Sequence, residues 1–282
     1  LAPEDDDYGP LNQSDLTRPG SLQADIRTNS NLQDTLTVGK DSNVLGDAVA
    51  GPGTNPPSIV INAEPGTIHG DQAAAATTVA LPPIEIPAGS PTGEPYVVPE
   101  GAPVTTDMAS CDCSSISVGA GATLILTGSG VLHLTGIDVG TDGTLDVSGE
   151  EVTLVVDSLQ TGADSTFSSS ADHLKIIGTG VGSITFAKQN IVNTTHDPAS
   201  LAIYVKGTNG LTIKKDIEFY GAIYAPEAAV HIDKEATIFG SIVAKTVDVD
   251  KAAAIHYDES LRESSSEQGG GDAAAVLAWR QL

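Results

Sequence analysis

The sequence predicts an all-β protein, a right-handed parallel β-solenoid with an extended N-terminal arm and a short apolar C-terminal tail. The first observation is a motif that occurs twice near the C-terminal end, as Phe219–Ala225 (FYGAIYA) and Phe239–Ala244 (FGSIVA), with Gly221 and Gly240 19 residues apart. The second is composition, since aromatic residues make up only 4% and small and β-branched residues dominate. A period of about 20 residues suits one coil of two or three short strands.

Each copy of the motif continues into a second alternating piece, Val230–Ile232 and then Val247–Val249. These pieces are 17 residues apart, so the second copy lacks two residues, which we place around Pro226–Glu227. Val, Ile and Leu are expected to point inward and stack on their equivalents in the next coil, while Gly and Ala suit the bends. An ordinary antiparallel sheet with two similar hairpins is the alternative.

The chain has 282 residues, enough for one or two domains, and is strongly acidic, with 37 Asp and Glu against 13 Lys and Arg and a formal net charge of −24. Without a basic surface to neutralise phosphates, no nucleic-acid partner is expected. From Asp41 to Asp172 there are 17 acidic residues and no Lys or Arg, whereas from Lys175 onward there are 10 basic and 13 acidic residues. This imbalance fits solubility in a salty or extracellular medium, or an acidic end of one subunit that meets the mixed end of the next.

The first part of the chain, residues 1–110, divides into three segments by composition and turn residues. Residues 1–20 read as an extended N-terminal arm that carries three consecutive Asp residues and little apolar content. Residues 21–70 read as irregular N-terminal solenoid coils, with short strands expected at Leu36–Val38, Val44–Asp47, Ile59–Ile61 and Thr67–Asp71. Residues 71–110 contain Pro at positions 82, 83, 87, 91, 95, 99 and 103. Because Pro cannot donate to a ladder, this segment is predicted to be a linker or an extended crossing laid along the solenoid.

Residues 111–261 form the regular β-solenoid of this prediction, with short alternating runs separated by Gly and Asp turns. The remaining residues, 262–282, contain a flexible polar link and an apolar tip, Ala273–Leu282, that holds the only Trp of the chain. The tip is expected to be either a capping helix on its own solenoid or a strand donated to another subunit, since an exposed apolar end is costly in water.

The runs Phe219–Ile232, Ile238–Lys245 and Ile255–Leu261 resemble the C-terminal β-solenoid domain of bacterial surface proteins, including pilus-assembly (PilX-like) and collagen-binding-like proteins. Trp279-Arg280 near the end is similar too, and the Gly-x-Ile-x-Ala pattern resembles bactofilins, which are polymer-forming β-solenoids. The resemblance covers residues 110–261 and implies export to the cell surface with a structural or adhesive role. It supplies no catalytic residues, and the Pro-rich segment departs from the bactofilin pattern.

Cys111 and Cys113, separated by Asp112, are the most chemically pointed feature. A tight intrachain disulfide, two inter-subunit disulfides, a metal-ligand pair and two buried thiols all remain open. Two Cys alone cannot complete a tetrahedral zinc site. In an exported protein a disulfide is favoured, within or between chains.

Other candidate sites carry weaker signals. Asp138, Asp142 and Asp146 lie in or beside successive strands and turns, where oxygen ligands could hold Ca²⁺, but they do not match the calcium-binding glycine repeat. A glycosidase needs two facing carboxylates, and Asp138, Asp146 and Asp157 are better explained as solvated residues of an acidic face. The six His show no zinc-site spacing, so neither an enzyme nor a resident metal is expected.

These observations favour an exported structural protein whose subunits assemble with one another into a filament or surface layer. A solenoid leaves unpaired backbone groups at both ends, and a terminal extension could fill a neighbour's edge by strand addition. The candidate donor residues are apolar or aromatic: Leu1, Tyr8, Leu11, Val276, Leu277, Trp279 and Leu282. A monomeric cell-surface adhesin or a module that binds carbohydrate or matrix glycans is the alternative. No stretch is long and apolar enough to span a membrane, and an export signal is expected to have been removed.

Overall fold

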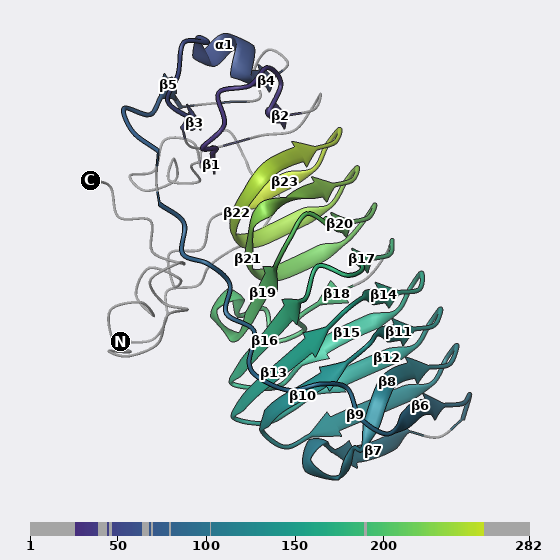
Figure 1. The fold of residues 1–282 in the computed structure, drawn as a ribbon. Coiled ribbons are helices and arrows are strands. Elements are labelled where there is room, and N and C mark those ends of the chain that lie inside the picture. Colours follow the sequence, from purple (N-terminus) through teal and green to yellow (C-terminus); the bar gives the residue numbers. More distant parts are fainter. Residues whose placement is uncertain are drawn as a thin grey trace, which may run out of the picture.

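The computed structural model describes residues 26–38, 44, 47–63, 68, 70–78, 80–101, 103–188 and 191–256. The expected arm, residues 1–20, and tail, residues 262–282, lie outside these described residues. The protein is nearly all β, with parallel strands stacked as a β-solenoid of about 9 turns and almost no helix (Figure 1). The fold class predicted from the sequence is confirmed, and the antiparallel alternative is wrong because every described strand pair is parallel.

Each coil contributes strands to three faces, and each face is one continuous parallel ladder. Face 1 contains β6 (Glu94–Val98), β8 (Cys113–Val118), β11 (Ile137–Val139), β14 (Leu159–Thr161), β17 (Ile184–Phe186), β20 (Leu211–Ile213) and the last parts of β21 (Glu218–Ile232) and β22 (Thr237–Val249). Face 2 contains β7 (Val104–Asp107), β9 (Thr123–Thr127), β12 (Thr144–Val147), β15 (Thr166–Ser169), β18 (Ile191–Val192), the first parts of β21 and β22, and β23 (Ala254–His256).

Face 3 contains β10 (Gly130–Leu134), β13 (Glu151–Val156), β16 (His173–Gly178), β19 (Leu201–Val205) and the middle parts of β21 and β22. Two 3-10 turns, η2 (Met108–Ser110) and η3 (Pro198–Ser200), lie between strands.

Side chains alternate along each strand, so of every two successive residues one points into the coil, and most of these inward residues are apolar. The interior contains Phe167, Phe186 and Phe219, which are fully buried and pack edge to face with ring centroids 6.0 and 6.1 Å apart. Such aromatic pairs stabilise beyond the area they bury. The core is therefore a continuous column that each new coil extends.

The repeated motif lies in β21 and β22, which pair along most of their length. Gly221 lies opposite Gly240 and Ala225 opposite Ala244, and the register then shifts so that Ala229 faces Thr246. The shift leaves two extra residues in the first copy after Ala225, which confirms the position of the length difference predicted from the sequence.

The N-terminal coils stack on the C-terminal end of the solenoid. Here β1 (Ile26–Arg27), β3 (Ala48–Ala50) and β5 (Gln72–Ala74) form a three-stranded sheet, and β2 (Leu36–Val38) pairs with both β22 and β4 (Ile61–Ala63). Figure 1 shows this unit at the end that carries β23, opposite to β6 and β7. We call the described residues from 26 to 78 the cap.

Within the cap, α1 (Pro57–Val60) contacts β3, β4 and β5. The strand predicted at Ile59–Ile61 is therefore wrong for Ile59 and Val60. Pro57 has no N–H and a fixed φ, so it suits the first turn of a helix. Val60 is fully buried while Ile59 is 42% exposed, as expected for a short helix that lies over the end of a coil.

A proline-rich segment, residues 80–93, connects the cap to the first coil and runs along face 3 (Figure 1). We call it the crossing segment. Its Ile84 is 8% exposed and packs in a cluster that includes Leu81 and one outward-facing residue from each of five successive coils: Val155, Ile177, Tyr204, Tyr224 and Val243. The Tyr224 hydroxyl donates to the Pro82 carbonyl oxygen at 2.6 Å. The crossing segment thus covers an apolar strip that a free solenoid face would expose.

Candidate functional site

The two ends of the regular solenoid are the candidate functional site, because the core column ends there in half-buried apolar side chains. At the first coil these are Tyr96 of β6, Val104 of β7 and Cys111 after η2. At the last coil they are Ile242, Val247 and Ile255. We call these two sets the N-terminal rim and the C-terminal rim. The C-terminal rim draws one residue from each of the three faces.

The N-terminal rim has two open strand edges among the described residues, because β6 pairs with β8 alone and β7 with β9 alone. The Val98 carbonyl oxygen accepts from the Gly119 N–H at 2.7 Å, so the backbone groups of Val98 face β8. Backbone groups alternate along a strand, and those of Pro95 and Val97 therefore face the open edge of β6. Pro95 offers no donor there, and Val97 is 63% exposed. The Tyr96 hydroxyl is hydrogen bonded to the Thr106 hydroxyl across the end of the coil.

Both strands, β6 and β7, lie inside the segment 71–110 that the sequence predicts to be a linker or crossing. The first coil was not predicted because a Pro within a run argues against a central strand. A Pro on the open edge of an end strand costs no ladder bond, which is why the strand still forms at Pro95.

Cys111 and Cys113 are joined in an intrachain disulfide with a Cα–Cα distance of 5.2 Å. The bond links the residue after η2 to the first residue of β8, and no described cysteine is free. Asp107 caps η2 by accepting from the Ala109 N–H at 2.8 Å. The disulfide and the Asp107–Ala109 hydrogen bond hold the third side of the N-terminal rim, where η2 lies against β10.

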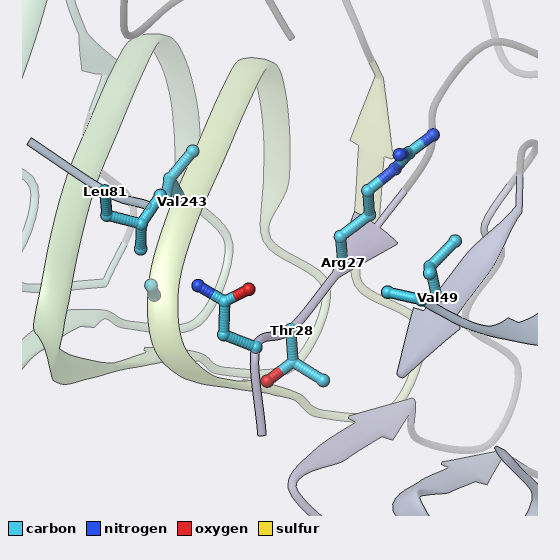
Figure 2. A pocket seen from close by; sticks show the side chains of 8 residues that line it. Arg27, Thr28, Val49, Leu81 and Val243 are labelled. Atoms are coloured by element: carbon cyan, nitrogen blue, oxygen red, sulfur yellow. The ribbon is translucent and has the colours of Figure 1, made fainter. Parts of the chain in front are cut away.

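The C-terminal rim is covered only in part by the cap. Leu36, Thr37 and Val38 of β2 pair with Val247, Asp248 and Val249 on face 1. On face 3 no described strand of the cap pairs with β22. Instead, a cavity of about 40 Å³ lies between the two, lined by Arg27, Thr28, Asn29, Val49, Ala75, Leu81, Val243 and Ala244 (Figure 2).

The cap also has its own small core, separate from the main one. It comprises Leu36, Val38, Val44, Ala48, Ala50, Val60 and Ile61. We call the contact between cap and C-terminal rim the seam. Among the described strands the seam contains one three-residue ladder, which lies beside a cavity, whereas β21 and β22 pair through twelve residue pairs.

An outward aromatic stack lies near the C-terminal rim on face 2. Ring centroids are 4.5 Å apart for His196–Tyr220, 4.7 Å for Tyr220–Phe239 and 4.8 Å for Phe239–His256. Burial lowers the pKa of the His256 imidazole. Burial, and then the nearby Glu218 carboxylate, raise the pKa of Tyr220.

Coil stacking also gathers ionisable side chains that are distant in the sequence. The Nδ1 atom of His231 lies 3.0 Å from an oxygen of Asp248. One potential ligand atom from each of His231, Asp233 and Asp250 lies within 4.8 Å of the other two. The group was not predicted from the sequence, although the 17-residue offset between the two motif copies aligns His231 with Asp248 and Asp233 with Asp250.

The calcium candidates are not gathered in the same way. Asp138 lies on face 1, Asp142 in the following corner and Asp146 on face 2, and the only described group of three metal-ligand-type side chains is the one around His231. The proposed donor residues of the arm and tail, Leu1 to Leu11 and Val276 to Leu282, lie outside the described residues.

Comparison with protein families gives a match to the family described as "Domain of unknown function (DUF7305)", over residues 101–264. This range is more than half of the 282-residue chain. The chain belongs to the DUF7305 family. The match begins within the first coil and ends just after β23, so the DUF7305 domain contains the regular solenoid and most of both rims. Neither the curated proteins nor the solved structures gave a match.

The DUF7305 match gives no specific evidence for the PilX-like or bactofilin-like repeats suggested by the sequence. Within the described part of the chain, no helix has the length and apolar character needed to cross a membrane.

Proposed function

We propose that this DUF7305 protein is an exported structural protein, a subunit that assembles with copies of itself into an extracellular filament or surface layer. The observation that carries the proposal is the pair of half-buried rims at the two ends of one continuous core column. Burying apolar side chains is the main favourable term in association, so two such ends favour a joint between subunits.

The rims match in register as well as in character. Val104 heads a column on face 2 that continues through Leu124 and Leu145 and ends at Ile255. A second subunit placed on the last coil would therefore bring its Val104 over Ile255 as though one more coil had been added. Its β6 and β7 would continue the ladders of faces 1 and 2, which removes the open edges.

Export to the cell surface, and the pilus-like or bactofilin-like character suggested by the repeated motif, belong to this proposal. The acidic composition and the disulfide at Cys111 and Cys113 support it, since disulfides persist in oxidising compartments.

A monomeric surface adhesin or glycan-binding module is the second candidate. It is favoured by the cap, which covers one end within the same chain, and by Pro95, which blunts the open edge of β6. In that case both ends are closed against neighbours, and the outer faces carry the function.

Electron microscopy of negatively stained protein over a range of concentrations separates these candidates. The proposal expects long uniform fibres and expects Val104→Asp to abolish them, because a carboxylate in the rim would be buried at the joint. The matched control is Val181→Asp, which places the same charge at a residue that is 73% exposed in a turn. Compact single rods at every concentration, in the full chain and in a Leu36→Asp variant whose seam is weakened, would contradict self-assembly and direct attention to glycan binding.

A further inference from the structure

We infer that the cap competes with a second copy of the chain for the C-terminal rim, so that release of the cap exposes the docking surface for the N-terminal rim of the next subunit. This inference rests on the proposed function and adds its regulation.

The strand that the cap contributes occupies the same position that a second subunit would use. On face 1, β6 begins the ladder at one end and β2 continues it at the other, with Val98 in the column that leads to Val249 and Val38. Residues Tyr96–Val98 of a neighbour would therefore replace Leu36–Val38 on the edge of β22. One edge accepts one strand, so the two partners exclude each other.

A second copy would also pair with more strands of the C-terminal rim, and cover more of its apolar side chains, than the cap does. Within the described residues the cap pairs with β22 on face 1 alone, and no cap strand pairs with β23. The N-terminal rim brings a strand for face 1 and another for face 2. It also brings Val104 to Ile255, which is left half-buried beside the cap.

The corner between faces 1 and 2 carries both lysines and carboxylates, and it offers one pair of opposite charges to the same joint. Two residues after Val249 lies Lys251, which follows Lys215 and Lys234 at the equivalent corner of the preceding coils. Two residues after Val98 lies Glu100. When Val98 takes the place above Val249, Glu100 comes to the corner that carries Lys251, an attraction between opposite charges of the size typical for exposed pairs.

The cap can leave without dismantling the rest of the chain. Its core is separate from the main core, and the strand pairing of the described seam is one three-residue ladder beside a cavity. The crossing segment stays anchored by the bond from Tyr224 to Pro82 and by buried Ile84. Six residue steps separate Ala75, whose N–H donates to Ala50 within the cap, from Leu81 of the crossing-segment cluster, and an extended chain of this length reaches about 20 Å.

Release and locking of the cap test the inference in opposite directions. Leu36 is 2% exposed and lies in the seam, so Leu36→Asp is expected to release the cap. We expect the concentration at which fibres appear, followed by light scattering and sedimentation, to fall about tenfold. The control Leu32→Asp adds the same charge to the cap at a residue that is 73% exposed, and it should behave as the wild type.

For the lock, Thr37→Cys is combined with Asp248→Cys, since these residues are direct neighbours across the seam. The oxidised double variant, with its cross-link verified by peptide mapping, should not assemble, and reductant should restore assembly. Wild-type protein with and without reductant controls for the native disulfide. The double charge exchange Glu100→Lys with Lys251→Glu should recover assembly that Glu100→Lys alone weakens about two- to fivefold.

The outcomes separate this inference from the proposed function. If the full chain forms fibres and neither release nor locking changes their formation, the competition is wrong and self-assembly stands. If no variant forms fibres, including Leu36→Asp, both are wrong.

Discussion

Replacing Ile84 by Ala tests whether the crossing segment contributes to stability or merely passes over the solenoid. Ile84 is 8% exposed and packs against Val155, Ile177 and Tyr204. The change removes three carbon groups, worth roughly 2.4 kcal/mol at about 0.8 kcal/mol each. The space that is left adds a cavity cost, so we expect the free energy of unfolding to fall by about 2–4 kcal/mol.

Urea denaturation measures this change, and hydrogen exchange locates it. Amides around Ile84 should lose protection before those of the central coils, because the crossing segment joins no ladder and is held by side chains. The control is Val131→Ala on β10 of the same face, 50% exposed, which should cost less than about 1 kcal/mol. Equal small effects at both positions would refute the reasoning, since they would mean that the apolar strip is not sealed by the crossing segment.

Three further predictions concern the coils themselves. Gly240 has φ +146°, and a Cβ there would lie 1.9 Å from the Gly221 carbonyl oxygen. Gly240→Ala should therefore lower the free energy of unfolding by more than about 1 kcal/mol in urea denaturation. An unchanged midpoint would contradict this close approach of the two backbones. Phe186→Ala should cost about 3–5 kcal/mol by the same assay and Phe186→Leu clearly less, because the first empties the middle of the aromatic column. His256 has a lowered pKa, so the unfolded chain takes up its proton first, and stability should fall as the pH drops below about 6.5. His256→Phe keeps an aromatic ring in the stack, and its melting temperature should therefore fall less between pH 8 and pH 5 than that of the wild type; parallel curves would rule out a role for His256.

Much of the fold could be predicted from the sequence because each coil of a solenoid repeats the same local sequence pattern. The alternation in Thr144–Val147 or Leu211–Ile213 determines which side chains point inward, and the Gly221–Gly240 spacing gives the length of a coil. Stacking order was harder to predict. Any alternating strand can pair in parallel with any other, so nothing in Leu36–Val38 indicates that its partner is Val247–Val249 and not the next coil along the chain.

The apolar strip under the crossing segment has a recognisable signal in the sequence. In each of five coils an apolar or aromatic residue stands at an outward position next to inward ones, as in Leu154-Val155-Val156 and Ile203-Tyr204-Val205. A strand with one solvated face would carry a polar residue there. This break in alternation predicts a covering segment, and the proline-rich stretch before the regular coils is a candidate for it.

For the candidate site, the sequence singled out Cys111 but none of the other rim residues. A rim is defined by the absence of a following coil, and Tyr96 or Ile255 has no local feature that distinguishes it from an interior position. The group around His231 escaped for a related reason, since its members meet only after two coils have stacked.

The position of the cap has a consequence for how the chain is made. β2 is among the first strands to be synthesised, and its partner on β22 is 211 residues later, from Leu36 to Val247. Ribosomal synthesis delivers the N-terminal part first, so β2 must wait until nearly the whole solenoid has been translated and wound. Contacts of such long range form late, after the local coils have repaid the entropy of closing the chain. A polypeptide that stops before Val247 offers β2 no strand edge, so a docked cap shows that synthesis has passed β22.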